Sequence, residues 1–281
     1  MPQVDPNNNP NHHQNAPLRR LPPGLADQIA VVLHKTEDPV NIGTAVRALA
    51  NMGFTDLRLV DPVPYERERI LGIAHHCEEL VDSIRHFPDL DAALADVTFV
   101  VGTAAVDHPN HPLTRNVRGL AGDLLDRTAH GRVALLFGPE ADGLDLAALD
   151  RCHVILSLPV DPGFPALNLS QSLLLVLYEI RMAAIDAPKE ANPPSITLAT
   201  KEEVELVFDL FEQALDGMAF FKGNAQQTMR LLRQTLYRAE MRPKEAGLLM
   251  GIARRIRWVM EPENQPKLEE MREMLKGEGG R

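Results

Sequence analysis

The stretch Asn41-Ile-Gly-Thr-Ala-Val-Arg47 lies between two apolar patterns that together predict a strand followed by a helix. Upstream, the short apolar run 29–33 is bounded by polar residues, which is typical of a buried strand. Downstream, apolar residues recur at helical spacing, at Ile42, Ala45, Val46 and Leu49. The opposite face of this helix carries Asn41, Thr44, Arg47 and Asn51. A cap amide, free N–H groups and a guanidinium therefore lie near the sheet edge, although an ordinary capped surface helix explains this stretch equally well.

Apolar runs and helical patterns alternate from Gln28 to about Asp186. The expected strands are 29–33, 57–60, 97–101, 133–137 and 154–158, and the expected helices are 42–52, about 66–76, 89–95, about 117–129 and 145–150. This order predicts an α/β domain at 27–186 with a mostly parallel sheet covered on both faces. Ligands bind such sheets at the carboxyl ends of the strands. A last helix, 167–184, contains a run that is apolar on all sides, so we expect it to be enclosed.

The ends of the chain differ from this domain in composition. Residues 1–26 are rich in Pro, Asn, His and Gln, which predicts a disordered tail, and His12-His13 have no supporting ligands for a metal. Residues 187–200 are a Pro-rich linker by composition. Residues 201–281 predict an all-helical extension with three amphipathic stripes, and Pro243 fits the first turn of the third helix.

The extension is basic although the whole chain has a formal net charge of −10. Nine basic and two acidic residues fall between Lys222 and Trp258, a local net charge of +7. A solvated helical surface normally mixes its signs, so this segment predicts contact with nucleic-acid phosphates. The candidate RNA-binding residues are Arg230, Arg233, Arg238, Arg254, Arg255 and Arg257.

Several common functions lack their motifs in the 281 residues. The chain has no GxGxxG after its first strand, no GxxxxGK[ST], no GxSxG and no HExxH, so dinucleotide, P-loop, serine-hydrolase and zinc-protease sites are unsupported. Its two cysteines, Cys77 and Cys152, are far apart and predict neither a disulfide framework nor a metal site. No apolar run is long enough to span a membrane, and we expect a soluble cytoplasmic protein.

Three segments in order resemble the SpoU/TrmH-type RNA ribose 2′-O-methyltransferases of the SPOUT superfamily. They are Asn41–Arg47, the segment Leu135-Leu-Phe-Gly-Pro-Glu-Ala-Asp-Gly-Leu144, and Leu158-Pro-Val with Ala166-Leu-Asn-Leu-Ser170. The helical stretches that begin at Met229 and Leu248 are similar to the extension of the subgroup that methylates cytidine and uridine in tRNA. The resemblance covers about residues 28–258.

The resemblance implies a C-terminal trefoil knot, a homodimer and S-adenosylmethionine as the cofactor, with no metal. It implies cofactor contacts at Thr103, Ala104, Ala105, Gly138, Leu158, Val160, Ala166, Leu167 and Asn168. The family often has Ser-Leu-Asn where this chain has Ala166-Leu-Asn168, so a backbone contact would survive and a hydroxyl would be missing. The implied substrate is a ribose 2′-OH of tRNA, at position 32 of the anticodon loop.

The resemblance also implies the catalytic residues Arg47, Asn41, Glu140 and Asn168. The family's essential arginine maps to Arg47, but a guanidinium stays protonated, so a phosphate clamp or alkoxide stabiliser is physically easier than a general base. Asn41 would hold Arg47 or the ribose. Glu140 would orient one of these two residues or accept the proton. Asn168 also fits a helix N-cap.

Three alternatives remain open from the sequence. The first is a ribosomal RNA 2′-O-methyltransferase, against which the extension argues. The second is an inactive SPOUT-like RNA-binding protein in which Ala166 marks a decayed site. The third is a generic nucleotide-binding α/β protein, which would leave the basic extension unexplained.

Overall fold

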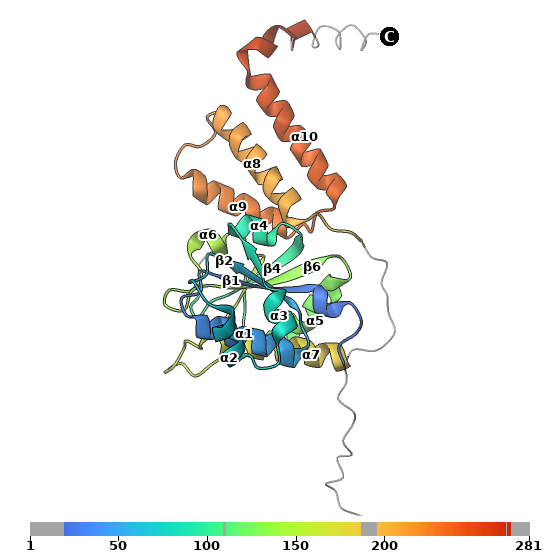
Figure 1. Ribbon diagram of the computed structural model, residues 1–281. Helices are drawn as coiled ribbons and strands as arrows, with labels where there is room; N and C mark the ends of the chain where they lie inside the picture. Colours follow the sequence, from blue (N-terminus) through green and yellow to red (C-terminus); the bar gives the residue numbers. More distant parts are fainter. Residues whose placement is uncertain (1–19, 109–110, 187–195, 268, 271–281) are drawn as a thin grey trace, which may run out of the picture.

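The computed structural model describes residues 20–108, 111–186, 196–267 and 269–270. In this part of the chain seven parallel strands form one sheet in the order β3-β2-β1-β6-β4-β7-β5 (Figure 1). The strands are β1 (Ile29–His34), β2 (Asp56–Val60), β3 (Arg85–Phe87), β4 (Val97–Thr103), β5 (Leu113–Thr114), β6 (Arg132–Phe137) and β7 (Val154–Leu156). The predicted parallel α/β sheet is confirmed.

Helices cover both faces of the sheet (Figure 1). One face carries α1 (Pro39–Met52), α2 (Arg67–Ile73), α3 (Glu78–Asp82), α5 (Val117–Thr128) and α7 (Leu169–Asp186). The other carries α4 (Leu90–Leu94) and α6 (Leu146–Leu149). Beyond them lies the extension of α8 (Lys201–Gly217), α9 (Ala225–Tyr237) and α10 (Pro243–Met260), and two short 3₁₀ helices, η1 and η2, span Leu25–Asp27 and Pro262–Asn264. The described part of the extension is thus helical, and Pro243 lies in the first turn of α10.

All five expected strands are present, but five short elements were not expected. They are β3, β5, α3, η1 and η2, and each has between two and five residues. Strand β7 also ends at Leu156, before the predicted end at Leu158. Elements this short give too few apolar residues to show a period, so the sequence pattern does not reveal them.

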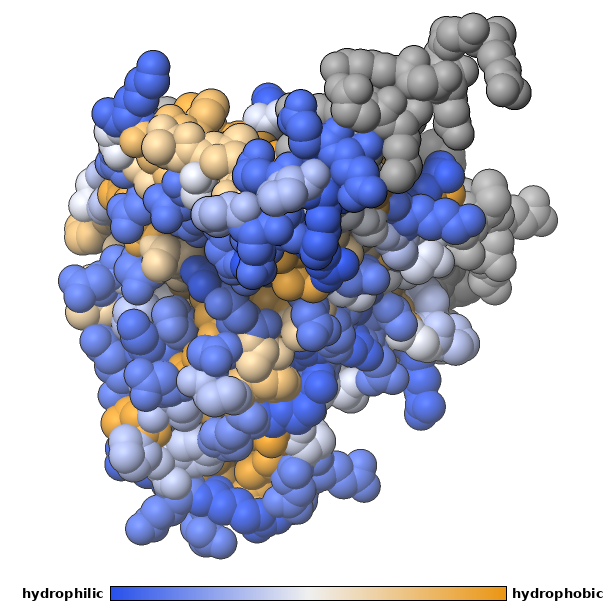
Figure 2. All heavy atoms as spheres, turned by 90° about the horizontal axis from the view of Figure 1, so that it is seen from above, coloured by the Kyte–Doolittle hydropathy of each residue, from blue (hydrophilic) through white to orange (hydrophobic). Residues whose placement is uncertain are grey.

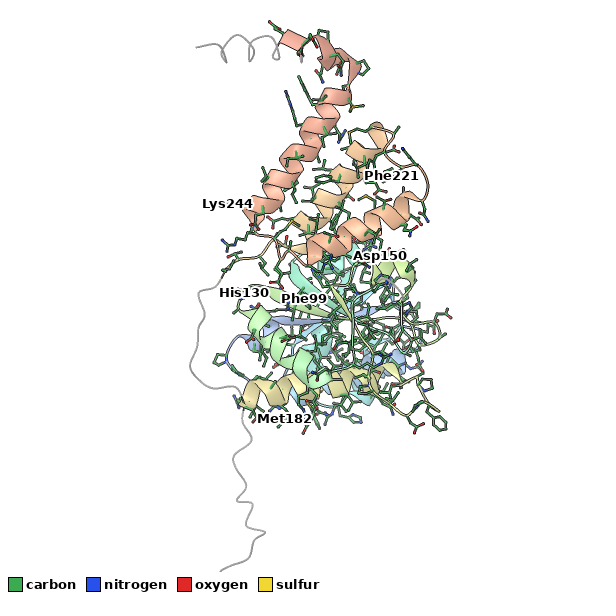
Figure 3. The ribbon with its side chains drawn as sticks, turned by 180° about the vertical axis from the view of Figure 1, so that it is seen from behind. Phe99, His130, Asp150, Met182, Phe221 and Lys244 are labelled. Carbon is green, nitrogen blue, oxygen red and sulfur yellow. The ribbon has the colours of Figure 1, made fainter. Side chains whose placement is uncertain are left out.

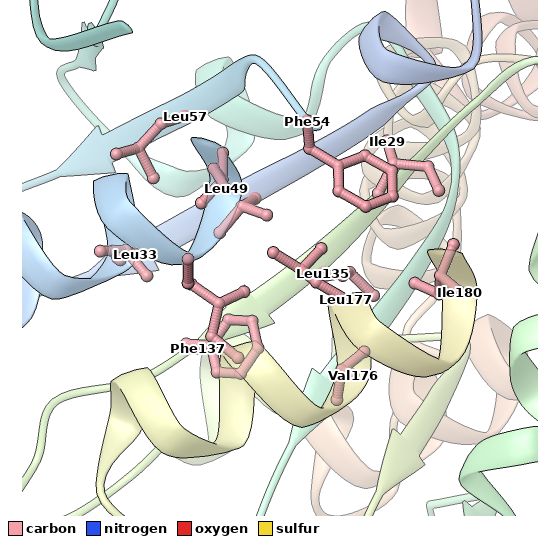
Figure 4. Close-up of a cluster of buried hydrophobic side chains, with 14 of the residues drawn as sticks. Ile29, Leu33, Leu49, Phe54, Leu57, Leu135, Phe137, Val176, Leu177 and Ile180 are labelled. Atoms are coloured by element: carbon pink, nitrogen blue, oxygen red, sulfur yellow. The ribbon is translucent and has the colours of Figure 1, made fainter. Parts of the chain in front are cut away.

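The main core lies between the sheet and the two helices α1 and α7, which cover one of its faces (Figure 4). All six residues of β1 are buried, because a central parallel strand is covered on both faces. Ile29 and Leu33 of β1 meet Leu177 and Ile180 of α7 in one cluster with Phe137 of β6. This packing fixes the loops that follow β1 and β6 relative to α1.

Helix α7 corrects one expectation. Its residues Leu173, Leu177 and Ile180 are fully buried, and it packs against α1 and α5. On the other side Leu174, Leu175 and Tyr178 are 39%, 47% and 47% exposed. The prediction that this helix is enclosed on all sides is therefore wrong for the single chain, because the described residues leave Leu174, Leu175 and Tyr178 exposed.

A buried arginine interrupts the apolar pattern of β2. Arg58 is 1% exposed and forms ion pairs with Asp56 and Asp96. Its guanidinium also donates to the carbonyl of Ala93 at 2.6 Å. A buried charge is tolerated only when it is paired in this way, and the network ties β2 to α4 and to the start of β4.

The extension lies on the opposite side of the sheet from α7, next to the face that carries α4 and α6 (Figure 3). Tyr237 of α9 stacks on His153 with ring centroids 4.3 Å apart. Arg230 of α9 forms an ion pair with Asp150 at 2.6 Å, and the N–H of Glu202 donates to the carbonyl of Ala95 at 3.1 Å. These contacts hold the extension firmly against the sheet domain.

Lys201 lies inside this contact region. It is 3% exposed, and its ammonium group pairs with Glu205 at 2.9 Å and contacts Tyr237. Burial lowers the pKa of Lys201 to about 8. Its charge therefore depends on the contact between α8 and α9.

Parts of the predicted terminal segments lie outside the described residues. For the expected tail at 1–26 these are residues 1–19, and the described remainder includes Leu25, which is 8% exposed and packs in the core. Residues 187–195 of the expected linker, with residues 268 and 271–281 of the extension, are likewise not described. The packed domain thus includes Leu25, which precedes the predicted start of the domain at residue 27.

Candidate active site

A cavity of about 330 Å³ lies at the carboxyl ends of β4, β6 and β7. Its walls come from the loops that follow these strands and from the start of α7. The lining includes eight of the nine predicted cofactor-binding residues: Thr103, Ala104, Ala105, Gly138, Leu158, Ala166, Leu167 and Asn168. Val160 is not part of the lining that the described residues form. Three loops that are far apart in the sequence, those after β4, β6 and β7, thus share one cavity at the edge where parallel sheets bind ligands. We call it the three-loop cavity.

Gly138 is required by the shape of this cavity. A Cβ atom at this position would lie 2.4 Å from the carbonyl carbon of Gly143 and 2.5 Å from the amide nitrogen of Leu144. Gly143 itself has φ of 70°, in the left-handed region. The loop from 138 to 144 therefore folds tightly on itself and presents backbone rather than long side chains. Such a wall fits a cofactor that is held largely by backbone groups.

A chain of hydrogen bonds connects the three sequence signatures at the mouth of the cavity. The amide Nδ2 of Asn41 donates to Oε1 of Glu140 at 2.6 Å. The amide Nδ2 of Asn168 donates to Oδ1 of Asn41 at 3.0 Å. Asn41 is 7% exposed, so its amide group is committed to these two neighbours. The structure thus brings Asn41, Glu140 and Asn168 together, and the contact between Glu140 and Asn41 is one of the two that the sequence left open for Glu140.

Asn168 has a second role at the start of α7. Its Oδ1 accepts the N–H of Ser170 at 2.8 Å and the hydroxyl of Ser170 at 2.7 Å. The side chain therefore caps α7 with its oxygen and reaches Asn41 with its nitrogen. The Ser170 hydroxyl is occupied by this cap.

Glu37 was not singled out in the sequence, yet it supports the same site. Its backbone N–H donates to Oε2 of Glu140 at 2.8 Å, and its carboxylate accepts the N–H of Ala141 at 3.2 Å. Glu140 is therefore held from both sides, by Asn41 and by Glu37. The only sequence signal was the position of Glu37 just after the first strand, and that position does not predict a contact 103 residues away.

Arg47 lies outside this chain of hydrogen bonds. It is exposed on α1, and its Nη1 donates to the carbonyl of His75 at 2.7 Å and lies 3.9 Å from Sγ of Cys77. Six residues of helix separate it from Asn41, about 9 Å along the axis. The structure thus places the cation on the same helix as Asn41 but directs it toward the loop after α2.

The basic residues of the extension fall into two groups. Arg230 and Arg233 form ion pairs with Asp150 and Glu205. Arg238 and Arg254 are exposed, Arg255 lies over the ring of Trp258 at 4.1 Å, and Arg257 donates to Gln213 at 2.6 Å. Two of the six predicted RNA contacts therefore also hold the extension together or fix it to the sheet domain.

Among the residues that the structure describes, no three His, Cys, Asp or Glu side chains are grouped so that they could bind a metal ion. His12 and His13 lie outside those residues. Cys77 and Cys152 are both buried and unpaired with each other. Within the same described part of the chain, every helix is too short or too polar to cross a membrane.

A family comparison decides the class of this fold. The sequence profile of the SpoU rRNA methylase family matches residues 28–178, more than half of the 281-residue chain. The chain belongs to the SpoU rRNA methylase family. The match spans all three signatures, from Asn41–Arg47 to the start of α7, and it ends before the extension.

Individual members of the SpoU family extend the similarity beyond the profile. A Pseudomonas aeruginosa protein named tRNA (cytidine/uridine/adenosine-2′-O-)-methyltransferase TrmJ is 32% identical over 239 residues, 81% of this chain and 93% of that protein. A Haemophilus influenzae protein described as an uncharacterized tRNA/rRNA methyltransferase is 31% identical over 232 residues, 81% of this chain and 94% of its own. The crystal structure of TrmJ from Z. mobilis ZM4 matches with a TM-score of 0.71 and 28% identity, covering 81% of this chain and 98% of that one. Because 81% of the chain is more than its first 200 residues, the similarity continues into the extension.

Proposed function

We propose that this SpoU-family chain is an S-adenosylmethionine-dependent tRNA ribose 2′-O-methyltransferase. The observation that carries the proposal is the hydrogen-bonded group of Glu140, Asn41 and Asn168 at the mouth of the three-loop cavity. It joins all three SpoU signatures at the edge where the sheet binds ligands. The names of the relatives, which describe 2′-O-methylation of tRNA, support tRNA as the substrate class.

In this proposal the three-loop cavity holds S-adenosylmethionine, which supplies the methyl group. The residues that would hold it are the eight predicted contacts that line the cavity: Thr103, Ala104, Ala105, Gly138, Leu158, Ala166, Leu167 and Asn168. Ala166 offers only its backbone, and the nearby Ser170 hydroxyl is already bonded to Asn168. We therefore assign the contacts of this segment to main-chain groups.

The role of Asn41 follows from its two hydrogen bonds. Both ends of its amide are used, one by Glu140 and one by Asn168, so it fixes the two loops relative to each other. The carboxylate of Glu140 accepts from Asn41 and from the N–H of Glu37, and its remaining lone pairs are available to a ribose hydroxyl. Holding that hydroxyl in line with the methyl group supplies a large part of the rate enhancement.

Arg47 would bind the RNA rather than accept the proton of the ribose 2′-OH. Its guanidinium stays charged, and it lies on the exposed side of α1, where Nη1 donates to the carbonyl of His75 and to Sγ of Cys77. The remaining N–H groups suit the phosphate next to the methylated ribose. Arg47 is thus a clamp that positions the substrate or stabilises the developing alkoxide.

The extension would bind the phosphates of the folded tRNA, with Arg238, Arg254, Arg255 and Arg257 as the main contacts. Figure 2 looks down on the extension and shows a largely hydrophilic surface with hydrophobic patches between. Leu231, Leu248 and Ile252 are exposed on the extension. Arg230 and Arg233 would serve this function indirectly, because their ion pairs hold α9 in place. Position 32 of the anticodon loop is the target we propose.

The proposal includes a homodimer, a trefoil knot and a cytoplasmic location. The exposed apolar stripe of Leu174, Leu175 and Tyr178 on α7 supports the dimer, since an apolar helix face of this kind is usually covered by another subunit. The packing of α7 against α1 and α5 is compatible with a knot formed by the C-terminal part of the sheet domain.

Two measurements test the proposed function. Calorimetry with S-adenosylmethionine tests the cofactor site, and transfer of labelled methyl groups to unmodified tRNA and to ribosomal RNA tests activity and substrate class. We expect cofactor binding and labelling of tRNA. Cofactor binding without any transfer would favour the inactive RNA-binding alternative, and labelling of ribosomal RNA alone would favour the ribosomal one.

A further inference from the structure

A second cavity, of about 620 Å³, lies at the carboxyl ends of β1 and β2. It is separated from the three-loop cavity by the 138–143 loop, since Pro139, Asp142 and Gly143 line both. The predicted cofactor contacts do not include any residue of its own walls. Its size falls within the ordinary range of small-molecule sites, roughly 300–1,000 Å³.

Two polar side chains in the wall of this cavity lack partners. His34 is 8% exposed and Thr36 is 1% exposed, and both line the cavity. Among the described residues, Nδ1 of His34 and Oγ1 of Thr36 have no hydrogen-bond partner. Buried polar atoms without partners are costly, and they are usually satisfied by water or a ligand. A ligand in the cavity would provide the missing partners.

The charge of the wall limits what that ligand can be. Four carboxylates line the cavity, from Glu37, Asp61, Asp142 and Asp145, against one ammonium group, that of Lys35. Lys35 is already 3.8 Å from Asp145. Burial, then the neighbouring Lys35, lowers the pKa of His34, which favours the neutral imidazole. This wall repels phosphate and offers acceptors to a neutral ligand that carries N–H donors.

A nucleobase with an exocyclic amino group has this chemistry. Cytosine and adenine present an amino donor beside ring acceptors, whereas uracil presents carbonyl oxygens in the place of the amino group. Pro62, Val63 and Pro139 add apolar surface to the cavity, which suits a flat base. The acidic wall therefore favours an amino-bearing base over uracil.

The second cavity also touches the catalytic group. Glu37 lines it, and the backbone N–H of Glu37 holds Oε2 of Glu140 at 2.8 Å. A ribose placed at Glu140 thus has its base next to this cavity. We propose that the cavity binds the base of the nucleotide that is methylated and favours one with an exocyclic amino group, an inference that rests on the proposed function.

The test compares three variants with a matched control. Asp61→Asn and Asp142→Asn remove wall charges at constant shape, and Thr36→Val removes the unpartnered hydroxyl. Asp123→Asn, an exposed carboxylate on α5, is the control. Binding of cytidine and uridine is measured by saturation-transfer NMR, and methyl transfer is measured on two tRNA transcripts that differ only in C or U at the nucleotide that the wild type modifies.

We expect the wild type to bind cytidine more strongly than uridine and to methylate the C transcript faster. Each aspartate variant lowers the C-over-U ratio by about tenfold, the value of one good base contact, and the control leaves it unchanged. Thr36→Val weakens cytidine binding while the protein melts at the same or a higher temperature, because an unpartnered hydroxyl is removed.

The two proposals fail in different ways. A wild type that binds cytidine but transfers no methyl group would contradict the proposed function and leave the base site standing. Methyl transfer with equal use of C and U, or a C-over-U ratio that the aspartate variants leave unchanged, would overturn the base site. Absence of any cytidine signal in the NMR measurement would overturn it as well.

Discussion

Replacing Glu140 with glutamine tests whether the hydrogen-bonded group at the cavity mouth positions the reaction. The carboxylate accepts the Asn41 amide at 2.6 Å and the Glu37 N–H at 2.8 Å. Glutamine has a single acceptor oxygen, so one of these donors must face the new amide nitrogen. Losing one hydrogen bond to a charged group costs about 1.5–3 kcal/mol, which at about 1.36 kcal/mol per factor of ten is a roughly 10- to 150-fold loss of rate.

The assay is single-turnover methyl transfer to tRNA at saturating S-adenosylmethionine, with calorimetry of cofactor binding alongside. We expect the rate constant to fall within that range and the cofactor affinity to stay within about twofold, since Glu140 is not among the proposed cofactor contacts. Asp123→Asn, an exposed charge change on α5, is the matched control. A rate within about twofold of wild type would refute the positioning role, and a loss above about 10³ would instead indicate that Glu140 is the general base.

Three further predictions concern the arginine, the extension and the domain contact. Arg47→Ala keeps cofactor binding but lowers methyl transfer by about 10²–10³-fold, as loss of a charge-stabilising group does; near-normal turnover would remove Arg47 from the mechanism. The double variant Arg238→Gln/Arg254→Gln lowers tRNA affinity and reduces the slope of log Kd against log salt by about two, roughly one per lost phosphate contact, whereas Arg118→Gln on α5 does not; equal slopes would exclude these contacts. Because the pKa of Lys201 is lowered from 10.5 to about 8, the unfolded chain holds the proton to higher pH, so this group adds stability as the pH rises through that window. Urea unfolding at both ends of the window should show that gain in the wild type relative to Lys201→Met, and identical changes in both proteins would contradict it.

The sequence predicted the sheet because its strands are apolar runs long enough to recognise. It also predicted ligand binding at the carboxyl ends of the strands, the edge at which the segments around Asn41, Glu140 and Asn168 lie. The charged interior of β2 was not predictable in this way. Arg58 reads as an interruption of an apolar run, and only the folded chain brings Asp96 to it from 38 residues away.

The direction of the Arg47 side chain depends on tertiary contacts, and so does the number of basic residues in the extension that are available to RNA. Arg47 donates a hydrogen bond to a carbonyl in the loop after α2. The helical pattern at 42–52 gives no information on where that loop lies. The local charge of +7 counted Arg230 and Arg233 as available cations. Their partners, Asp150 and Glu205, lie outside the segment that was counted, so the sum overstated the charge open to RNA.

The most direct test of the central claim is the chemical identity of the product. Unmodified tRNA is incubated with the protein and S-adenosylmethionine, digested to nucleosides and analysed by mass spectrometry, with position 32 then read from fragments. We predict a 2′-O-methylated nucleoside at a single position, formed by the wild type and strongly reduced in Arg47→Ala. A methyl group on a base, or no methylated nucleoside while the protein binds both cofactor and tRNA, would contradict ribose methylation.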